Sequence, residues 1–487
     1  MINYVNLRDL TKLANDKKLS EKYVNYICGF KEEHQYRHDE IEIIYQIVSS
    51  QEAKSINFNN FLYSYSIPQL NKEFDLLYLG NDCVINLELK SEFSSIQKIE
   101  HQLISNKHYL KLISNNLKLY VYVKKNNKLY ILNDNKLIES DIKEFYESVN
   151  SIKPIQKELD MLFSPKNILV SPLNSPDKFI NSEYLLTENQ TTIKKEILDF
   201  IKDTNDFHFC GLTGSAGTGK TLLLYDIVKT LSKSHKVIVV HSGILCDGHY
   251  TLNSNISNIK IIPAKDLRYR EIKDVDLIVV DEAHRLYESI LDKIERWIKK
   301  EEKKCVFTYD EKQKMSNSEN RRKTMETILK LCDSYIYKLT NKIRTNKEIA
   351  LFITCLRDLS KYRKEYLFNN VKIIFEPDKK RAVEIAKQLK MDNYTYISYT
   401  PSFYDFSLHY QISDFNTHEV IGQEFDGVVM IMDENFFYEK CFLKGKTHPN
   451  PDYIYTQLLY QGLTRTREKL ALIITDESLL ENVLMLF

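Results

Sequence analysis

Two groups of residues in this chain have the types and the spacing that phosphate chemistry requires. The first is the sequence G-S-A-G-T-G-K-T at 214–221. Glycines let backbone N–H groups curl around an anionic triphosphate, the lysine reaches its β and γ phosphates, and the hydroxyl that follows can bind Mg²⁺. We therefore expect the following residues to bind a nucleoside triphosphate: Gly214, Ser215, Ala216, Gly217, Thr218, Gly219, Lys220 and Thr221.

The elements around this loop favour the same chemistry. Residues 207–212 are predicted to form a short buried strand, and residues 222–230 a helix whose positive N-terminal end faces the phosphates. A second apolar run, at 276–280, is typical of a buried parallel strand, and Asp281 and Glu282 follow it at the end where ligands collect. Asp281 would hold Mg²⁺ through water, and Glu282 would polarise the attacking water.

The second group consists of Asp75, Glu88 and Lys90. Residues 67–78 and 83–91 are predicted to be strands joined by a turn at 80–82. Alternate strand residues share a face, so Glu88 and Lys90 point the same way and the hairpin can bring Asp75 beside them. Two carboxylates and a lysine can hold Mg²⁺ and orient a hydroxide for attack on a phosphodiester. The E-x-K pattern also occurs as a plain cross-strand charge pair, but apolar neighbours indicate a buried strand, where unpaired charges are costly.

These three positions resemble the signature of the PD-(D/E)xK nuclease superfamily. The resemblance implies that Asp75 and Glu88 are metal ligands, and that the helix after the hairpin places Gln102 near the scissile phosphate. A further acid could come from the amphipathic segment at 39–48. Either Glu40 or Glu42 could supply it, and the sequence does not choose between them.

Short motifs on either side of the phosphate loop resemble those of superfamily 1 helicases. They follow the family's order, at 186–190, 309–313, 339–345, 417–428 and 460–470. The segment 417–428 is similar to the one that couples nucleic acid to ATP. The resemblance implies an adenine-reading Gln190, a γ-phosphate-sensing Gln313, arginines Arg344 and Arg465 that neutralise the transferring phosphoryl group, and nucleotide contacts from Gly422 and Glu424.

Within that superfamily the chain resembles the Schlafen group 3-like DNA/RNA helicase domain. The signatures that carry this resemblance lie at 214–221, 280–285 and 422–428. The family implies ATP and Mg²⁺ as cofactors. The short spacing between motifs leaves no room for the large accessory subdomains of processive enzymes, so unwinding, translocation and switching all remain open.

The composition limits how the chain could bind nucleic acid or a metal, and where it could act. Lys and Arg total 68 and Asp and Glu total 67, a net charge of +1, so nucleic-acid binding would have to come from local groups. The eight cysteines show no metal-ligand spacing. We also expect a cytoplasmic protein, because no signal peptide or membrane span is recognisable.

The predicted fold class is α/β, with two RecA-like parallel-sheet lobes and an N-terminal α/β restriction-endonuclease-like domain. We expect the nuclease-like domain at 1–150, a proline-containing linker at 151–182, the first lobe at 183–337 and the second lobe at 338–487.

Together these interpretations predict an ATP-dependent helicase or translocase fused to an Mg²⁺-dependent nuclease. The expected partner is nucleic acid, with DNA favoured over RNA and with single-stranded regions or ends. Such fusions resemble bacterial anti-phage nuclease–helicase proteins. Two alternatives stay open: a repair or recombination enzyme, and a regulatory NTPase with an inactive N-terminal binding module.

Overall fold

The computed structural model describes residues 3–30, 36–67, 72–163, 170–203, 208–340, 346–401, 413–446 and 452–487. The chain divides into two units, Met1–Ile168 and Leu169–Phe487. The division falls inside the segment 151–182, which was predicted to be a linker. Residues 170–180 pack into the second unit, where Val170, Leu173 and Phe179 are buried in an apolar core.

The first unit is built on a six-stranded sheet with the order β1-β2-β3-β4-β5-β6. Neighbouring strands are antiparallel except for β3 and β4, which are parallel and are connected through α4. The strands are β1 (Phe61–Ile67), β2 (Lys72–Leu79), β3 (Val84–Lys90), β4 (Leu117–Val123), β5 (Lys128–Asn133) and β6 (Lys136–Ser140). The helices are α1 (Leu7–Leu10), α2 (Lys17–Cys28), α3 (His38–Ser49), α4 (Ile96–Leu110), α5 (Ile142–Ser151) and α6 (Leu159–Leu162).

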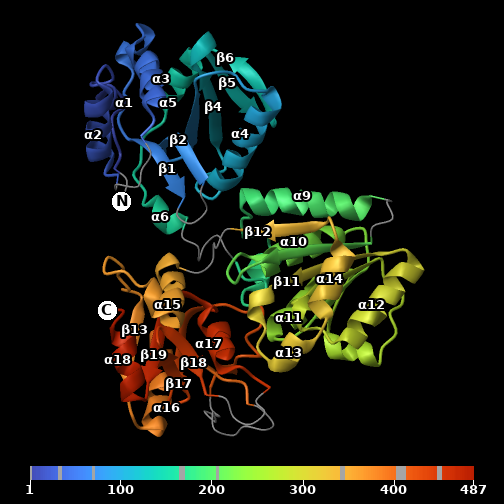
Figure 1. Cartoon of the computed structure of the whole chain (residues 1–487). Helices are drawn as coiled ribbons and strands as arrows, with labels where there is room; N and C mark the ends of the chain where they lie inside the picture. Colours follow the sequence, from blue (N-terminus) through green and yellow to red (C-terminus); the bar gives the residue numbers. More distant parts are fainter. Residues whose placement is uncertain are drawn as a thin grey trace. The chain divides into compact units, whose positions relative to one another are not determined.

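Helices cover both faces of this sheet. Figure 1 shows α3 and α5 on the opposite side from α4. Apolar residues of α3 and α5 join the sheet in one core. β3, in the interior of the sheet, is buried except at its last residue, Lys90. The hairpin that carries the acidic residues is therefore a fixed part of the core.

The strand predicted at 67–78 is wrong in extent. Ile67 ends β1 and lies opposite Lys72, the first residue of β2. Because β1 and β2 are antiparallel, the chain must reverse between them, so one strand cannot continue through this region. Residues 68–71 lie outside the described part of the chain.

The second unit contains two lobes. The first lobe has a parallel six-stranded sheet with the order β12-β7-β11-β10-β8-β9. Its strands are β7 (Phe209–Gly214), β8 (Val237–His241), β9 (Ile259–Pro263), β10 (Leu277–Asp281), β11 (Lys304–Tyr309) and β12 (Ile336–Leu339). Its helices are α8 (Pro176–Ile180), α9 (Glu188–Lys202), α10 (Lys220–Leu231), α11 (Asp247–Asn255), α12 (Glu288–Glu301), α13 (Asn317–Arg321) and α14 (Thr324–Cys332).

Separate apolar cores lie on the two faces of this sheet. One contains residues of α9, α10 and α11, and the other contains residues of α12 and α14. β10 and β11 run side by side in the middle of the sheet. Their carboxyl ends bring the residues after each strand together, at the edge where α/β sheets bind ligands.

The second lobe has a parallel five-stranded sheet with the order β13-β19-β16-β14-β15, together with an antiparallel hairpin of β17 and β18. The strands are β13 (Val371–Phe375), β14 (Thr395–Ser398), β15 (Phe415–Asn416), β16 (Phe425–Met432), β17 (Phe436–Glu439), β18 (Phe442–Gly445) and β19 (Thr466–Ile474). The helices are α15 (Lys347–Arg357), α16 (Lys379–Gln388), α17 (Tyr455–Leu463) and α18 (Glu477–Leu484).

These sheets confirm the predicted α/β class with two RecA-like lobes and an N-terminal α/β region. The eight cysteines form no disulfide bond. Among the described helices, none combines the length and the continuous apolar run that crossing a membrane requires.

Candidate functional site

The phosphate loop connects the end of β7 to the start of α10. Gly217 and Gly219 have φ values of 76° and 84°, in the left-handed region that favours glycine. The buried Lys220 starts α10, and its Nζ donates to the carbonyl oxygens of Gly214 (2.6 Å) and Ser215 (3.1 Å). The lysine is thus folded back over the loop, where an anionic phosphate would meet both its charge and the helix N-terminus.

Asp281 and Glu282 lie where β10 ends, and a residue of the neighbouring strand fixes both. Thr308 Oγ1, on β11, donates to Asp281 Oδ1 (2.7 Å) and accepts from the backbone N–H of Glu282 (3.1 Å). Glu282 has a φ of 55°, unusual for a residue with a side chain. Such a conformation costs roughly 1–3 kcal/mol and persists only where neighbouring bonds hold it. Thr308 provides one such bond, to the Glu282 backbone N–H.

Charge around Glu282 keeps its carboxylate ionised. Burial alone would raise its pKa, but His284, Arg285, Lys220 and Arg465 together lower the pKa of Glu282 to about 2. Burial lowers the pKa of His284 to about 4, so this imidazole is neutral near pH 7. The cations that hold Glu282 charged at that pH are therefore Lys220 and the two arginines.

Replacing Thr308 with valine is expected to weaken Mg²⁺ use in ATP hydrolysis by about 10- to 100-fold, the usual effect of removing a group that orients a metal ligand. Valine keeps the volume and removes both hydrogen bonds. The measurement is the Mg²⁺ concentration for half-maximal ATPase activity. Thr308→Ser retains the hydroxyl and should behave like the native chain; an equal defect in both variants would contradict this role.

A chain of polar contacts leads from the phosphate loop to the second lobe. Lys220 Nζ lies 3.8 Å from Asp310 Oδ2, which accepts from Gln313 Nε2 (2.7 Å). Gln313 Oε1 accepts from Arg465 NH2 (2.9 Å), and Arg465 Nε donates to the carbonyl oxygen of Gln461 (3.2 Å). Gln313 and Arg465, predicted to act on the same phosphate, are therefore in direct contact although they belong to different lobes.

Residues of both lobes enclose a polar cavity of about 20 Å³. The residues that line it are Ala216, Gly217, Gly219, Lys220, Thr221, Glu282, Gln313, Gly422, Glu424 and Arg465. All ten belong to the set predicted from the sequence to bind or hydrolyse a nucleotide. A cavity of this size holds about one water molecule, which is less than the volume of a triphosphate.

Two residues predicted to contact the nucleotide, Gln190 and Arg344, are not among those that line this cavity. Gln190 Oε1 accepts from the backbone N–H of Thr187 (3.0 Å), and its Nε2 donates to the carbonyl oxygen of Thr218 in the phosphate loop (3.3 Å). Adenine recognition by Gln190 therefore stays a prediction. Arg344 lies outside the described residues.

Gly422 and Glu424 belong to the segment 417–428, which is predicted to couple nucleic acid to ATP. Both contact residues 173–174, which precede α8. Gly422 has a φ of 78°, and a Cβ there would lie 2.9 Å from Leu173 Cδ1. The backbone N–H of Glu424 donates to Asn174 Oδ1 (2.9 Å). Their position is thus fixed both by backbone conformation and by residues 173–174.

In the first unit, the structure brings together the second predicted group. β2 and β3 are antiparallel, and Leu76 and Leu87 are the last pair at the open end of their hairpin. Asp75 and Glu88 are the next residues beyond this pair, one on each strand. The backbone N–H of Leu89 donates to Asp75 Oδ2 (2.8 Å). Lys90 Nζ lies 4.0 Å from Glu88 Oε2. Both carboxylates are buried, whereas Lys90 is partly exposed.

Three amides surround the Glu88 carboxylate. Oε1 accepts from Nδ2 of Asn86 (3.1 Å) and from Nδ2 of Asn106 (2.8 Å). Oε2 accepts from Nε2 of Gln102. Gln102, predicted to lie near the scissile phosphate, thus contacts a predicted metal ligand through α4. Asn86 on β3 and Asn106, which is also on α4, hold the other carboxylate oxygen.

The environment of the carboxylates suits a divalent cation. Burial and the nearby Asp75 raise the pKa of Glu88 to about 8, and burial also raises the pKa of Asp75. A cation between them would relieve both effects. Within the described parts of the chain, no three His, Cys, Asp or Glu side chains form a metal-binding group. Mg²⁺ commonly uses one or two carboxylates and completes its shell with water and substrate phosphate, which these two residues could support.

The structure separates the two acids that the sequence left as alternatives. Glu40 is buried on α3; burial and the charge of Asp75 raise its pKa to about 7, and its Oε2 accepts from the Tyr63 hydroxyl (3.0 Å). Glu42 is more exposed and pairs with Lys124 Nζ (2.5 Å). Glu40 is therefore the acid next to Asp75.

Glu40→Gln should accordingly reduce nucleic-acid cleavage by about 10-fold or more, and Glu42→Gln should leave it unchanged. The two substitutions make the same chemical change two residues apart on one helix, so Glu42→Gln is a matched control. Initial cleavage rates at saturating Mg²⁺ are the measurement. A larger loss in Glu42→Gln than in Glu40→Gln would exclude Glu40 from the site.

Several residues of the two sites belong to no recognised motif. Arg37 lies among carboxylates, with NH1 2.8 Å from Glu40 Oε1 and NH2 2.7 Å from Glu73 Oε2. Asn86 and Thr308 contact predicted site residues from within strands. The signal for Asn86 is that it alternates with Glu88 and Lys90 along β3, which places the three on one face. Thr308 has no such signal, because its contact depends on the pairing of β10 with β11.

The family comparison concerns the second unit. Residues 208–376 match the family model of the Schlafen group 3 DNA/RNA helicase domain. This match covers less than half of the chain. A sequence search finds no matching curated protein.

Solved helicase structures show distant similarity. The Pif1 helicase from Bacteroides, in complex with ADP-AlF3 and ssDNA, is 14% identical, with 59% of this chain and 92% of that chain covered and a TM-score of 0.32. The Pif1 helicase from Candida albicans is 12% identical, with 61% and 98% covered and a TM-score of 0.36. These scores are too low to transfer function. The family match is the stronger finding: residues 208–376 are similar to the Schlafen group 3 DNA/RNA helicase domain.

Proposed function

We propose that the second unit is an ATP-driven nucleic-acid helicase or translocase and that the first unit is an Mg²⁺-dependent nuclease. The observation that carries the first part is the cavity in which phosphate-loop residues, Glu282 and second-lobe residues converge. The family match supports nucleic acid as the partner. DNA remains the favoured form, with single-stranded regions or ends.

Hydrolysis in this proposal depends on lobe closure. The triphosphate enters when the lobes separate, and Lys220 leaves the loop carbonyls to contact it. Arg465 then exchanges Gln313 for the γ phosphate, and Glu282, held ionised, orients the attacking water. After hydrolysis the contact between Arg465 and Gln313 re-forms. One arginine thereby makes the state of the nucleotide and the separation of the lobes interdependent.

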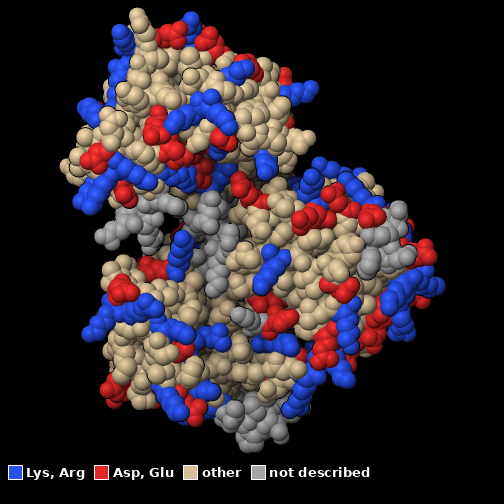
Figure 2. Space-filling model, turned by 45° about the horizontal axis from the view of Figure 1, so that its top comes forward, with Lys and Arg blue, Asp and Glu red and all other residues tan. Residues whose placement is uncertain are grey.

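Nucleic acid would bind through local groups rather than through a charged face. Figure 2 shows Lys and Arg interspersed with Asp and Glu on the visible face of the molecule. This agrees with the net charge of +1. Binding should therefore depend less steeply on salt than that of a strongly basic protein.

The nuclease part rests on Asp75, Glu88 and Lys90 at the end of one buried hairpin. Asp75 and Glu88 would hold Mg²⁺, which supplies an activated hydroxide and neutralises the phosphate when bound. Lys90 would orient the attacking water, and Gln102 would position the Glu88 carboxylate. Glu40 adds a further acid beside Asp75.

One observation favours a second candidate, a regulatory NTPase whose first unit binds and does not cut. Glu88 accepts three amide hydrogen bonds and its pKa is raised to about 8, so the residue can also be satisfied as a buried polar group. In that case ATP hydrolysis would persist without any Lys90-dependent cleavage.

Nucleic-acid stimulation of ATP hydrolysis tests the motor. The steady-state ATPase rate of the full chain is measured alone and with single-stranded DNA, duplex DNA and single-stranded RNA. We expect stimulation by at least one of them, and its absence with all three would exclude a motor.

A role in anti-phage defence is part of this proposal. It predicts that Lys220→Ala and Lys90→Ala each abolish protection of a bacterial host during phage challenge. Protection that survives both substitutions would exclude that role, and a DNA-damage phenotype on deletion would favour the repair alternative.

A further inference from the structure

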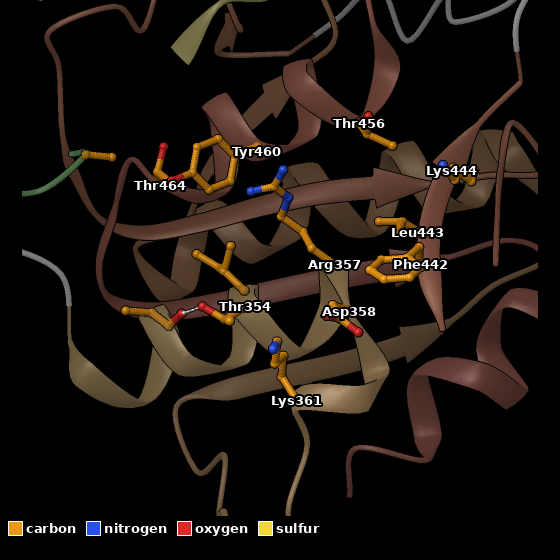
Figure 3. Close-up of a pocket in the computed structure, with 13 residues that line it drawn as sticks. Thr354, Arg357, Asp358, Lys361, Phe442, Leu443, Lys444, Thr456, Tyr460 and Thr464 are labelled. Atoms are coloured by element: carbon orange, nitrogen blue, oxygen red, sulfur yellow. Dashed lines mark hydrogen bonds between the residues drawn. The ribbon is translucent and has the colours of Figure 1, made fainter. Parts of the chain in front are cut away.

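A pocket of the second lobe lies beside the nucleotide cavity and shares Ala216 with it. Its volume is about 390 Å³, within the usual range for small-molecule sites. Its walls come mainly from α15, α17 and β18, and Ala216 of the phosphate loop also lines it. Figure 3 shows the side chains of Arg357, Lys361, Phe442 and Tyr460 around it.

Positive charge in this pocket is poorly compensated. Arg357 and Lys361 both line it, and neither side chain forms a hydrogen bond or an ion pair with a described residue. Lys444 adds a third cation, 3.8 Å from Glu439 Oε2. The one acid in the lining, Asp358, already accepts from the backbone N–H (3.1 Å) and the hydroxyl (2.5 Å) of Ser360. The pocket therefore offers N–H donors to an anion.

Aromatic rings provide the apolar side of the same pocket. The Arg357 guanidinium lies over the Tyr460 ring, 4.5 Å from its centroid. This contact orients the guanidinium and leaves its edge free to donate to an anion. Phe442 also lines the pocket and is 52% exposed, a high value for a phenylalanine. An exposed ring next to unpaired cations suits a planar group that carries a phosphate.

The walls are held in place by the backbone. The N–H of Leu359 donates to the carbonyl oxygen of Cys441 (2.8 Å), and Asp358 forms a β-bridge with Phe442. These bonds tie the hairpin to the end of α15. A ligand would meet preformed walls, which lowers the entropy cost of binding.

We propose that this pocket binds a mononucleotide at a second site, separate from the triphosphate at Lys220. Its phosphate lies between Arg357 and Lys361, and its base stacks against Phe442. The pocket volume accommodates one nucleotide unit. Free mononucleotide is the expected source, and the phosphorylated end of a strand offers the same chemistry.

Binding at this site is coupled to the catalytic arginine. Thr464 lines the pocket and directly precedes Arg465. An occupied pocket therefore restricts the end of α17 from which Arg465 reaches Gln313. This consequence rests on the proposed ATPase function, whereas binding itself does not.

The test uses AMP and the full chain carrying Lys220→Ala, which removes the ammonium that would hold a triphosphate. Isothermal titration should give one AMP per chain. Arg357→Gln and Lys361→Gln should each weaken binding by about 10-fold or more, because each removes a charged donor to the phosphate. Lys364→Gln, an exposed lysine outside the pocket, should have no effect.

Two further probes identify the chemistry. Inorganic phosphate should bind at least about 10-fold more weakly than AMP, because it lacks the ring. A 5′-phosphorylated oligonucleotide should compete poorly with AMP if the natural ligand is a free nucleotide. Strong competition would still support a binding site in this pocket, but its ligand would be the phosphorylated end of a strand.

Three results would overturn the proposal. They are the absence of AMP binding at millimolar concentration, binding that both pocket variants retain in full, and binding that the native chain shows but the Lys220→Ala chain lacks. The last would place AMP at the phosphate loop. None depends on ATP hydrolysis, so a failure of the proposed function remains distinguishable. In the native chain AMP should also change ATP turnover by about 5-fold or more, and an equal change in Arg357→Gln would exclude coupling through this pocket.

Discussion

Replacing Glu282 with glutamine should give a chain that still binds ATP but hydrolyses it about 10²- to 10⁴-fold more slowly, the usual contribution of a group that directs proton transfer. Glutamine keeps the size of the side chain and removes the charge that Lys220, Arg285 and Arg465 maintain. Binding depends on Lys220 and the loop, which this change leaves in place.

Two measurements on the same preparation check this result. Binding of a fluorescent ATP analogue should remain within about 5-fold of the native value, and single-turnover hydrolysis should fall. Glu271→Gln is a suitable control, because Glu271 is exposed and pairs with Lys273 away from the phosphate loop. Hydrolysis at the native rate in Glu282→Gln would remove this residue from the mechanism.

Replacing Lys90 with alanine should reduce nucleic-acid cleavage by about 10²- to 10³-fold, as expected for the loss of a catalytic donor in a buried site. The charge of Lys90 also lowers the pKa of both Asp75 and Glu88, so its removal makes both carboxylates harder to ionise. Because Lys90 is partly exposed at the end of β3, the sheet should tolerate alanine.

Cleavage of labelled strands, together with a thermal unfolding scan, separates catalysis from folding in this variant. Lys125→Ala is the matched control, since Lys125 is largely exposed and pairs with the exposed Glu92. Native cleavage in Lys90→Ala would mean that the first unit does not use this group. ATP hydrolysis should be unchanged in both variants.

The sequence predicted the motif-bearing part of the fold well, for physical reasons. The apolar run before Asp281 could only be a buried strand, and the glycines before Lys220 required a strand–loop–helix connection. The same reasoning placed Glu88 and Lys90 on one face of a strand. The local sequence pattern was sufficient in each case, because the residues that carry the chemistry are part of, or next to, the strand or helix that positions them.

Contacts between distant segments could not be predicted in this way. Thr308 acts on Asp281 only because β10 and β11 are neighbours, and strand order is not visible in the sequence. Glu40 and Glu42 have the same local pattern, and only the position of Asp75 distinguishes them. The strand predicted at 67–78 was too long, because the reversal between Ile67 and Lys72 follows from pairing with β1.

The proposed function implies that ATP hydrolysis by the second unit drives or restrains cleavage by the first. The most direct test is cleavage of labelled single- and double-stranded DNA and RNA with Mg²⁺, with and without ATP, in the native and Lys220→Ala chains. The account predicts that the native chain cuts at least one substrate and that ATP changes the rate in the native chain only. A cleavage rate that ATP does not change in the native chain would contradict the coupling between ATP hydrolysis and cleavage. No cutting of any substrate, with or without nucleotide, would contradict the nuclease and leave the first unit as a binding module.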